Sequence, residues 1–204
     1  MFVEDTAVVL DELALIARPG HAARRGETPS IAAALSEYRP IRHTRAPGRL
    51  DGGDVLRVGR TVYAGLSARS NKPGIDQLRE IVSPHGYEVK SVPVSGCLHL
   101  KSACSCVAPQ TLLINREWVA ADAFSGLELI DVHPDEPSAA NALLVGQTVV
   151  FPASYPLTRA ILEQRGLTLE TVDASELAKA EGALTCQSLI FRRDARRGGE
   201  GSAS

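Results

Sequence analysis

A polar residue placed ahead of an apolar, strand-like run recurs along the 204-residue chain at a nearly constant interval. These polar residues, which we call lead residues, are Asp5, Asp51, His99, Asn141 and Cys186. Their separations are 51 − 5 = 46, 99 − 51 = 48, 141 − 99 = 42 and 186 − 141 = 45 residues. A period near 45 residues indicates a repeat architecture, in which each unit buries its apolar face against its neighbours.

Each unit also carries the signals of one helix followed by one strand. Thr28-Pro29, Asn71-Lys72-Pro73 and Tyr155-Pro156 place a proline at the start of an apolar-periodic segment, as helix beginnings favour. Glycines follow three of the segments and predict their ends. The expected helices span residues 28–38, 71–86, 117–124 and 155–166, and the expected strands after them span 41–43, 87–92, 127–132 and 167–172. This alternation predicts an α/β protein.

The repeat has a consequence for the lead residues. If the units close around an axis, side chains at equivalent positions converge on that axis although they lie far apart in sequence. Asp5, Asp51, His99 and Cys186 then meet. An open solenoid instead places them in a row along one face, and the periodicity does not choose between the two arrangements.

Composition narrows the classes of partner. The chain is 44% hydrophobic and 23% charged with a formal net charge of −2, and no basic stripe interleaved with aromatic residues is present. Nucleic acid and anionic membranes are therefore poor candidate partners, and a small soluble ligand fits better.

No apolar run approaches the roughly 20 residues that cross a bilayer, and the chain opens on Met1-Phe2-Val3-Glu4-Asp5 rather than on a basic and then apolar leader. We therefore expect a cytoplasmic protein. The four cysteines lack CxxC spacing and are expected to be free thiols. One catalytic domain is expected over residues 1–193, and the Gly-, Ser- and Arg-rich residues 194–204 are expected to be a disordered tail.

The lead residues allow a particular chemistry. Cys186 becomes a nucleophile as a thiolate, which a nearby positive charge or histidine favours. His99 titrates near neutrality and can give a proton to a leaving amine and later take one from water. Carboxylates at Glu4, Asp5 and Asp51 suit a cationic group or a charged histidine. Together these groups indicate attack on a cationic sp2 carbon, for which a guanidinium is the obvious candidate.

Each of these features has a structural alternative. A lone buried cysteine is most often packing, and Leu98-His99-Leu100 fits a strand with a half-buried histidine. Residues 50–54, Leu-Asp-Gly-Gly-Asp, fit a turn before a strand, and Arg18-Pro19-Gly20 is interpreted as a turn alone. A metal held by His99 with Cys97, Cys104 and Cys106 lacks a convincing fourth ligand, so neither a metal nor a cofactor is expected.

Seven strings in order along the chain carry a family resemblance: FVEDTAVV (2–9), RPGHAARRGE (18–27), LDGGDVLRVG (50–59), GLSARSN (65–71), CLHLKSACS (97–105), AAN (139–141) and ALTCQSL (183–189). In combination they resemble the dimethylarginine dimethylaminohydrolases. The resemblance implies the five-bladed ββαβ propeller, or pentein, fold of the guanidino-group-modifying superfamily. It also implies hydrolysis of Nω-methylated arginines to citrulline and methylamine or dimethylamine without a cofactor.

The resemblance also implies roles for individual residues. Cys186 resembles the nucleophile that forms a covalent thiouronium intermediate, His99 the general acid and base, and Asp51 the acid that supports the histidine. Glu4 and Asp5 resemble the carboxylates that bind the guanidinium. Arg24 and Arg69 resemble the arginines that bind the amino-acid end of the substrate, since arginine pairs well with a carboxylate.

Two departures from the family pattern stand out. Glu181 occupies the position five residues before the nucleophile, where an aspartate is common, and it is expected near the guanidinium. The chain also begins at FVED, whereas family members carry a further N-terminal segment. We therefore expect Asp5 to begin the later strands of a first blade whose helix and leading strand are missing from this chain, and we favour an incomplete version of a longer protein.

Two other functions remain as alternatives. Another guanidino-modifying activity, such as arginine or agmatine deimination, uses similar chemistry, although the LDGGD, LHLKS and LTCQS strings argue against it. An inactive protein that binds arginine analogues fits the absent N-terminal segment. A homodimer is a possible assembly.

Overall fold

The computed structural model describes residues 2–192, so the expected tail at 194–204 lies outside the described residues. The described part forms four three-stranded sheets of the same design. In each, two strands form an antiparallel hairpin, and the third returns parallel to the second. The sheets are β1 (Ala7–Val9), β2 (Ala14–Ile16) and β3 (Ile41–His43); β4 (Val55–Val58), β5 (Thr61–Leu66) and β6 (Glu88–Pro93); β7 (Cys104–Ala108), β8 (Thr111–Ile114) and β9 (Glu128–Asp131); β10 (Leu143–Val145), β11 (Thr148–Pro152) and β12 (Thr168–Val172).

Helices make the crossover in three of the four units: α1 (Thr28–Ser36), α2 (Lys72–Val82) and α4 (Pro156–Gln164). The predicted proline starts are confirmed, because each has a proline in its first turn. The Asn71 side chain also caps α2 by accepting from the backbone N–H of Gly74 at 3.0 Å. Gly166 ends the segment after α4 with a φ of 76°.

The helix expected at 117–124 is wrong over its first half. Only the 3₁₀ turn η5 (Ala121–Phe124) forms there. The Asn115 side chain accepts the N–H of Glu117 at 2.9 Å, and the carbonyl of Trp118 accepts the N–H of Ser95. These contacts hold 115–118 as a turn, so its backbone groups do not enter a helix.

Two expectations about the units at the ends of the described chain are also wrong. The strands after Asp5 are not the later strands of a unit whose helix precedes them, because β1, β2 and β3 form one complete sheet with α1 between β2 and β3. No strand follows Cys186 within residues 188–192. There, Leu189 and Phe191 pack against the apolar cluster formed by the first sheet and α1. The described chain therefore holds four complete units and a fifth lead residue.

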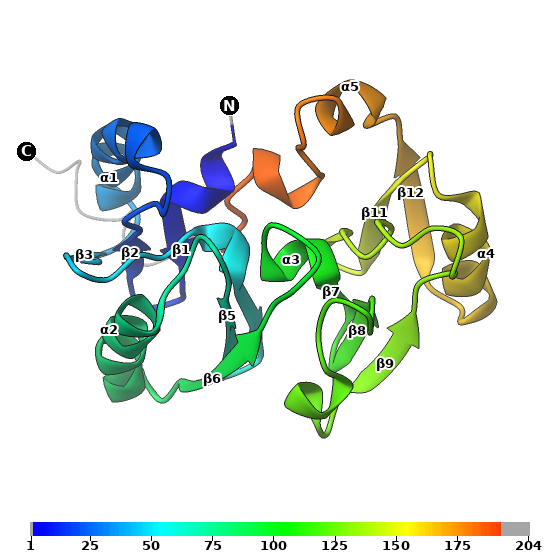
Figure 1. Ribbon diagram of the computed structural model, residues 1–204, viewed down its shortest axis with the longest axis horizontal. Coiled ribbons are helices and arrows are strands. Elements are labelled where there is room, and N and C mark those ends of the chain that lie inside the picture. Colours follow the sequence, from blue (N-terminus) through cyan, green and yellow to red (C-terminus); the bar gives the residue numbers. More distant parts are fainter. Residues whose placement is uncertain (1, 193–204) are drawn as a thin grey trace, which may run out of the picture.

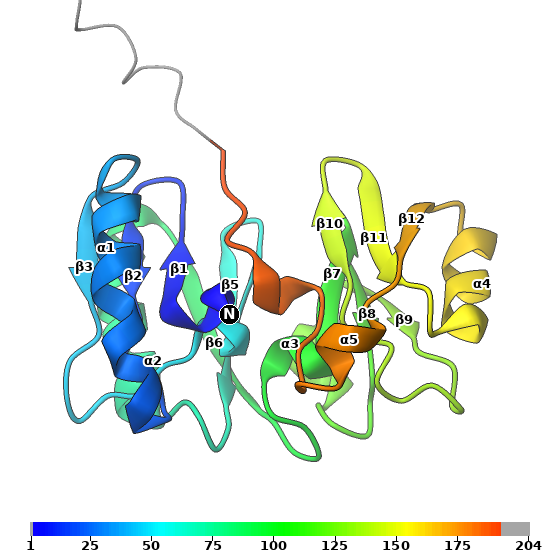
Figure 2. The same cartoon turned by 90° about the horizontal axis from the view of Figure 1, so that it is seen from above.

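The four sheets lie in an arc with α1, α2 and α4 on its outer side (Figure 1). Seen from above, the first two units and the last two stand as two groups (Figure 2). Apolar clusters fill the units and the boundaries between them, for example Leu10, Leu50 and Leu78 at the first boundary. Within residues 2–192, no helix is both long and apolar enough to cross a lipid bilayer.

Short turns occupy the inner side of the arc: η1 (Val3–Thr6), η3 (Gly52–Asp54), α3 (Leu100–Ala103) and η6 (Thr185–Gln187). Each contains or directly follows a lead residue. The hairpin and crossover of each unit thus bring one lead position to a common centre. The remaining short elements are η2 (Ala22–Glu27), η4 (Ser83–His85) and α5 (Ser175–Ala178).

Candidate active site

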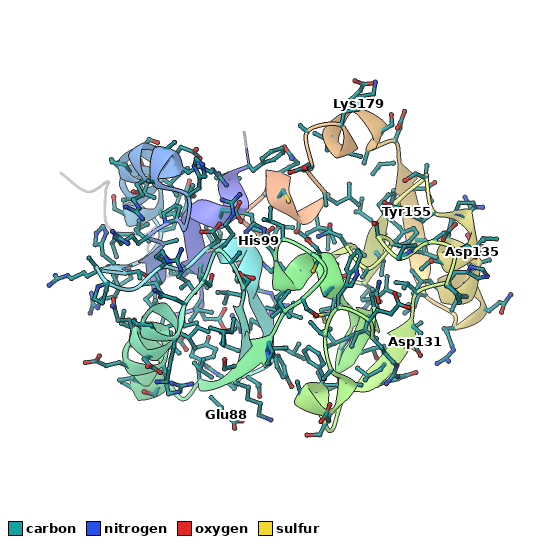
Figure 3. All side chains as sticks on the ribbon, in the orientation of Figure 1. Glu88, His99, Asp131, Asp135, Tyr155 and Lys179 are labelled. Carbon is teal, nitrogen blue, oxygen red and sulfur yellow. The ribbon has the colours of Figure 1, made fainter. Side chains whose placement is uncertain are left out.

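Three lead residues from three segments meet at the inner side of the arc. His99 Nε2 lies 3.0 Å from Asp51 Oδ2 and 3.7 Å from Asp5 Oδ1. All three side chains are buried, and Asp51 is fully so. His99 lies between the two groups of units (Figure 3). Asp5, Asp51 and His99 therefore meet, as predicted for units that share a common centre.

Asp51 is held by a loop from the first unit. Its Oδ1 accepts the backbone N–H of Gly20 at 2.7 Å. Gly20 has no room for a side chain, because a Cβ there would stand 2.3 Å from the backbone oxygen of Arg69. The Arg18-Pro19-Gly20 segment, interpreted from sequence as a turn alone, therefore also fixes the carboxylate that faces His99.

The surroundings of His99 favour its protonated form. Burial is the largest single influence and opposes the charge. The hydrogen bond to Asp51 and the charges of Asp5, Asp54 and Asp51 outweigh it, so that the pKa of His99 is raised. An imidazole in this position holds a proton to higher pH than one in water.

Cys186 lies in η6, beside the carboxylates of η1. The next residue before it, Thr185, donates its hydroxyl to Glu4 Oε2 at 2.7 Å, and its backbone N–H is accepted by Asn141 Oδ1 at 3.2 Å. The Cys186 sulfur accepts the N–H of Ala183 at 3.4 Å. Burial raises the pKa of the thiol, and the charges of Glu4 and Asp5 add to that effect against the opposing Ala183 N–H and Lys101 charge.

Both acids of the FVED string are already paired within the chain. Lys101 Nζ lies 2.7 Å from Glu4 Oε1 and Thr185 occupies Oε2. Asp5 receives the backbone N–H of Gly53 on Oδ1 and the guanidinium of Arg24 on Oδ2. Each carboxylate therefore already stabilises a positive charge or a set of N–H and O–H donors.

The two arginines assigned to substrate binding differ in their pairing. Arg24 contacts Asp5, both carboxylate oxygens of Glu27 and the Phe2 carbonyl. Arg69 is a quarter exposed, and its ion-pair contact in the described residues is with Asp51, at 3.9 Å. Arg69 is thus the freer of the two to take an incoming anion.

Glu181 lies in the segment between α5 and η6. It is exposed and has a left-handed backbone with a φ of 57°. Among the hydrogen bonds and ion pairs of residues 2–192, none joins its side chain to Glu4, Asp5 or His99. No contact in the described residues therefore supports the expected position of Glu181 near a substrate guanidinium.

Sequence reasoning missed three residues that assemble the site. Lys101 pairs with Glu4, Thr185 links η6 to η1, and the fully buried Asp54 accepts the backbone N–H of Leu100 at 2.9 Å. Asn141 was found as a lead residue without a role, and its amide bonds the Lys101 carbonyl and Thr185. The period located Asn141, whereas the other three stand beside lead residues and carry no spacing signal.

A cavity of about 280 Å³ lies against the same centre. Its walls come mainly from β1, β4, β7 and β10 and are largely apolar, and Glu4, Lys101 and Thr185 also line it. His99 and Cys186 are not among its lining residues. The Glu4–Lys101 pair therefore borders this cavity and, through Thr185, also contacts the turn that carries Cys186.

Asp5, Asp51 and His99 have ligand-type atoms within 4.8 Å of one another. Their separations and partners are those of a hydrogen-bonded group: Asp51 uses its two oxygens for His99 and Gly20, and Asp5 uses its own for Gly53 and Arg24. In this structure the three residues therefore form a hydrogen-bonded group of two carboxylates and an imidazole.

No family model matches the chain. The N(G),N(G)-dimethylarginine dimethylaminohydrolase of Pseudomonas aeruginosa is 35% identical over 193 residues, which cover 94% of this chain and 76% of that protein. The chain belongs to the dimethylarginine dimethylaminohydrolase family. The protein of the same name from Streptomyces coelicolor is 38% identical and covers 94% of this chain and 74% of its own length.

Solved structures agree with this family assignment. The Pseudomonas aeruginosa dimethylarginine dimethylaminohydrolase, solved as a cysteine-to-serine mutant complexed with citrulline, superposes with a TM-score of 0.89 at 35% identity over 93% of this chain and 75% of that chain. An amidinotransferase from Microseira wollei, at 17% identity and a TM-score of 0.84, shares the fold. This dimethylarginine dimethylaminohydrolase homologue therefore has the α/β fold of its solved relative, and the amidinotransferase has the same fold.

Proposed function

We propose that this chain hydrolyses Nω-methylated arginines, asymmetric dimethylarginine and monomethylarginine, to citrulline and dimethylamine or methylamine. One observation carries the proposal: a buried histidine paired with Asp51 and a cysteine beside two carboxylates converge on a scaffold 35% identical to such a hydrolase. The solved relative that binds citrulline supports the choice of product.

The first half of the reaction forms a carbon–sulfur bond. The Cys186 thiolate attacks the guanidinium carbon, and His99 gives its proton to the departing dimethylamine as the carbon–nitrogen bond breaks. A cationic thiouronium remains on the sulfur. The raised pKa of Cys186 makes the thiol the resting form, and a bound guanidinium favours the thiolate by its charge.

The second half removes the substrate from the sulfur. Neutral His99 takes a proton from water, and the resulting hydroxide attacks the thiouronium carbon. The carbon–sulfur bond then breaks as the proton of the added hydroxyl passes to the departing sulfur, which releases citrulline and restores the thiol and the protonated histidine. Asp51 stabilises that histidine in its charged form through the 3.0 Å contact.

In this proposal the guanidinium of the substrate replaces a positive side chain of the protein as the partner of a site carboxylate. Asp5 exchanges the Arg24 guanidinium for that of the substrate, and Arg24 turns with Arg69 toward the substrate carboxylate. Glu4 keeps Lys101 and orients Thr185 beside the nucleophile. Glu181 is proposed to approach the guanidinium only in the substrate complex.

We further propose that the four units belong to a five-bladed ββαβ propeller, in which Cys186 leads the fifth blade. The near-constant spacing of the five lead residues and the arc of four like sheets support it. Leu189 and Phe191 pack against the first sheet, where a fifth blade has to lie beside the first.

A substrate panel tests the proposed activity. Citrulline, amine and ammonia release are measured with asymmetric dimethylarginine, monomethylarginine, arginine and agmatine, for the wild-type chain and Cys186→Ser. Dimethylamine and citrulline from the dimethylated substrate, absent in the variant, are expected. Ammonia release from arginine or agmatine in preference to amine release contradicts the proposal and assigns a deiminase instead.

A further inference from the structure

The buried carboxylate of Asp54 has no assigned part in the chemistry, yet it sits at the centre of the site's scaffold. It is fully buried at the end of η3. Its Oδ1 accepts the backbone N–H of Leu100 at 2.9 Å, and its Oδ2 accepts the hydroxyls of Ser67 and Ser70 at 2.7 and 2.6 Å. All three partners are donors that stabilise the ionised carboxylate, while burial opposes the charge and leaves the pKa of Asp54 raised.

Each donor leads to a different residue of the candidate active site. Leu100 directly follows His99 in the chain. The Ser70 hydroxyl, besides donating to Asp54, accepts the backbone N–H of Asp51 at 3.0 Å. The Ser67 hydroxyl likewise accepts the backbone N–H of Arg69 at 3.0 Å. One carboxylate therefore fixes the backbone beside the histidine, its acidic partner and a substrate-binding arginine.

The residues around Asp54 are tightly packed. A Cβ at Gly65 would stand 2.6 Å from Asp54 Oδ1 and 3.0 Å from the Leu100 Cβ. Strand β5 thus closes against the carboxylate at a position where only glycine fits. A buried charge held by three donors acts on its neighbours at a lower effective dielectric than a charge in water.

We propose that Asp54 is the positioning residue of this active site: it sets the His99, Asp51 and Arg69 backbones in one frame and holds His99 in its protonated form by its charge. The catalytic importance of this positioning rests on the proposed function. The effect of the Asp54 charge on the protonation of His99, which it does not contact, can be measured without turnover.

Other charged groups face His99 and have to be separated from Asp54. Asp51 and Asp5 lie at 3.0 and 3.7 Å from Nε2. Arg69 and Arg24 partly neutralise those two acids, and Lys101 is neutralised by Glu4. The Cys97 thiol, whose pKa burial raises to about 11, donates to the His99 carbonyl and is uncharged near neutrality.

The test is an NMR titration of the His99 imidazole in wild type, Asp54→Asn and Asp76→Asn, with His99→Gln to assign the signal. Asp54→Asn keeps the side-chain shape and removes the charge, and we expect the pKa of His99 to fall by about one unit. Asp76 is a half-buried acid of α2 that lies outside the site, so its variant controls for a general change in charge. An unchanged pKa in Asp54→Asn overturns the proposal.

A second variant serves if Asp54→Asn does not fold. Ser67→Ala/Ser70→Ala keeps the aspartate but removes two of the donors that stabilise its anion, so the aspartate takes up a proton more readily. The pKa of His99 then falls as well. A folded double variant with an unchanged His99 pKa overturns the proposal equally.

Kinetics on the methylarginine substrate then separate the contribution of Ser67, which holds Arg69, from that of Ser70, which holds Asp51. Ser67→Ala is expected to raise KM with kcat little changed, because it releases the Arg69 backbone. Ser70→Ala is expected to lower kcat, because it releases Asp51. A loss of thermal stability with KM and kcat unchanged in both variants contradicts the positioning role. Absence of turnover in wild type contradicts the proposed function alone and leaves the titration result standing.

Discussion

At the scale of single residues, the surroundings of the site shift the pKa values of its titratable groups. The pKa of His99 and that of Cys186 are both raised, the first by acids that outweigh burial and the second mainly by burial. The thiol is thus the resting form of Cys186 near neutrality, and the imidazole of His99 keeps its proton to higher pH than a free imidazole. A cation beside Cys186 is what converts the thiol to the reactive form.

The thiol prediction concerns alkylation of the free protein. The iodoacetamide rate at Cys186, taken as the difference between wild type and Cys186→Ser, is expected to rise with a midpoint above the ordinary thiol pKa of 9.0. A saturating, unreactive cationic arginine analogue lowers that midpoint. A midpoint below 9.0 without ligand contradicts the raised pKa.

The histidine prediction concerns stability against pH. Because the pKa of His99 is raised in the folded state above 6.5, its protonation contributes stability that is fully present below the unfolded value. That contribution is lost as pH rises through the folded pKa. Urea unfolding of wild type and His99→Gln from pH 5 to 9 should show a difference that shrinks with rising pH. A difference that grows with pH contradicts the assignment.

At the scale of elements, the sequence predicted much of the fold because its signals are local. Proline starts, glycine stops and alternating strands depend on neighbouring residues, and three helices and the strands after all four crossovers were predicted from them. The segment at 117–124 was not, because contacts of the Asn115 side chain and of Ser95 decide its backbone. The role of Gly20 was likewise hidden, since it depends on Arg69, far along the chain.

The element-scale prediction is a matched glycine pair. Gly20→Ala is expected to lose roughly 1–3 kcal/mol of unfolding free energy, because the new methyl group meets the Arg69 backbone and displaces the N–H that Asp51 accepts. Gly26→Ala, with nothing within 4 Å of the added Cβ, is the control. Chemical denaturation of both variants measures the difference, and equal stability of the two contradicts the close approach.

At the scale of the whole molecule, residues from separate units hold the centre together. The period located the lead residues, so the meeting of Asp5, Asp51 and His99 followed from sequence once a common centre was assumed. The network around them did not, because Lys101, Thr185 and Asp54 act through side-chain geometry that no spacing encodes. The sequence period therefore predicts the order of the units, whereas the contacts that join the units depend on side-chain packing.

The whole-molecule prediction concerns the Glu4–Lys101 pair, which joins the first unit to the third. Lys101→Met leaves the buried Glu4 charge without its partner and is expected to cost about 3 kcal/mol of unfolding free energy. Glu4→Gln/Lys101→Met recovers part of that loss, since no lone charge remains. Denaturant unfolding of the three proteins measures it. A double variant less stable than Lys101→Met contradicts the pairing.

The most direct test of the central claim is to map the covalent adduct. Wild type, His99→Gly and Cys186→Ser are each quenched during incubation with asymmetric dimethylarginine and digested for mass spectrometry. We expect a thiouronium adduct on the Cys186 peptide of the wild type and none in Cys186→Ser. We expect more of the adduct in His99→Gly, because loss of the histidine slows the attack of water on the adduct more than it slows adduct formation. Turnover that persists in Cys186→Ser, or an adduct on Cys97 or Cys106 instead, contradicts the account.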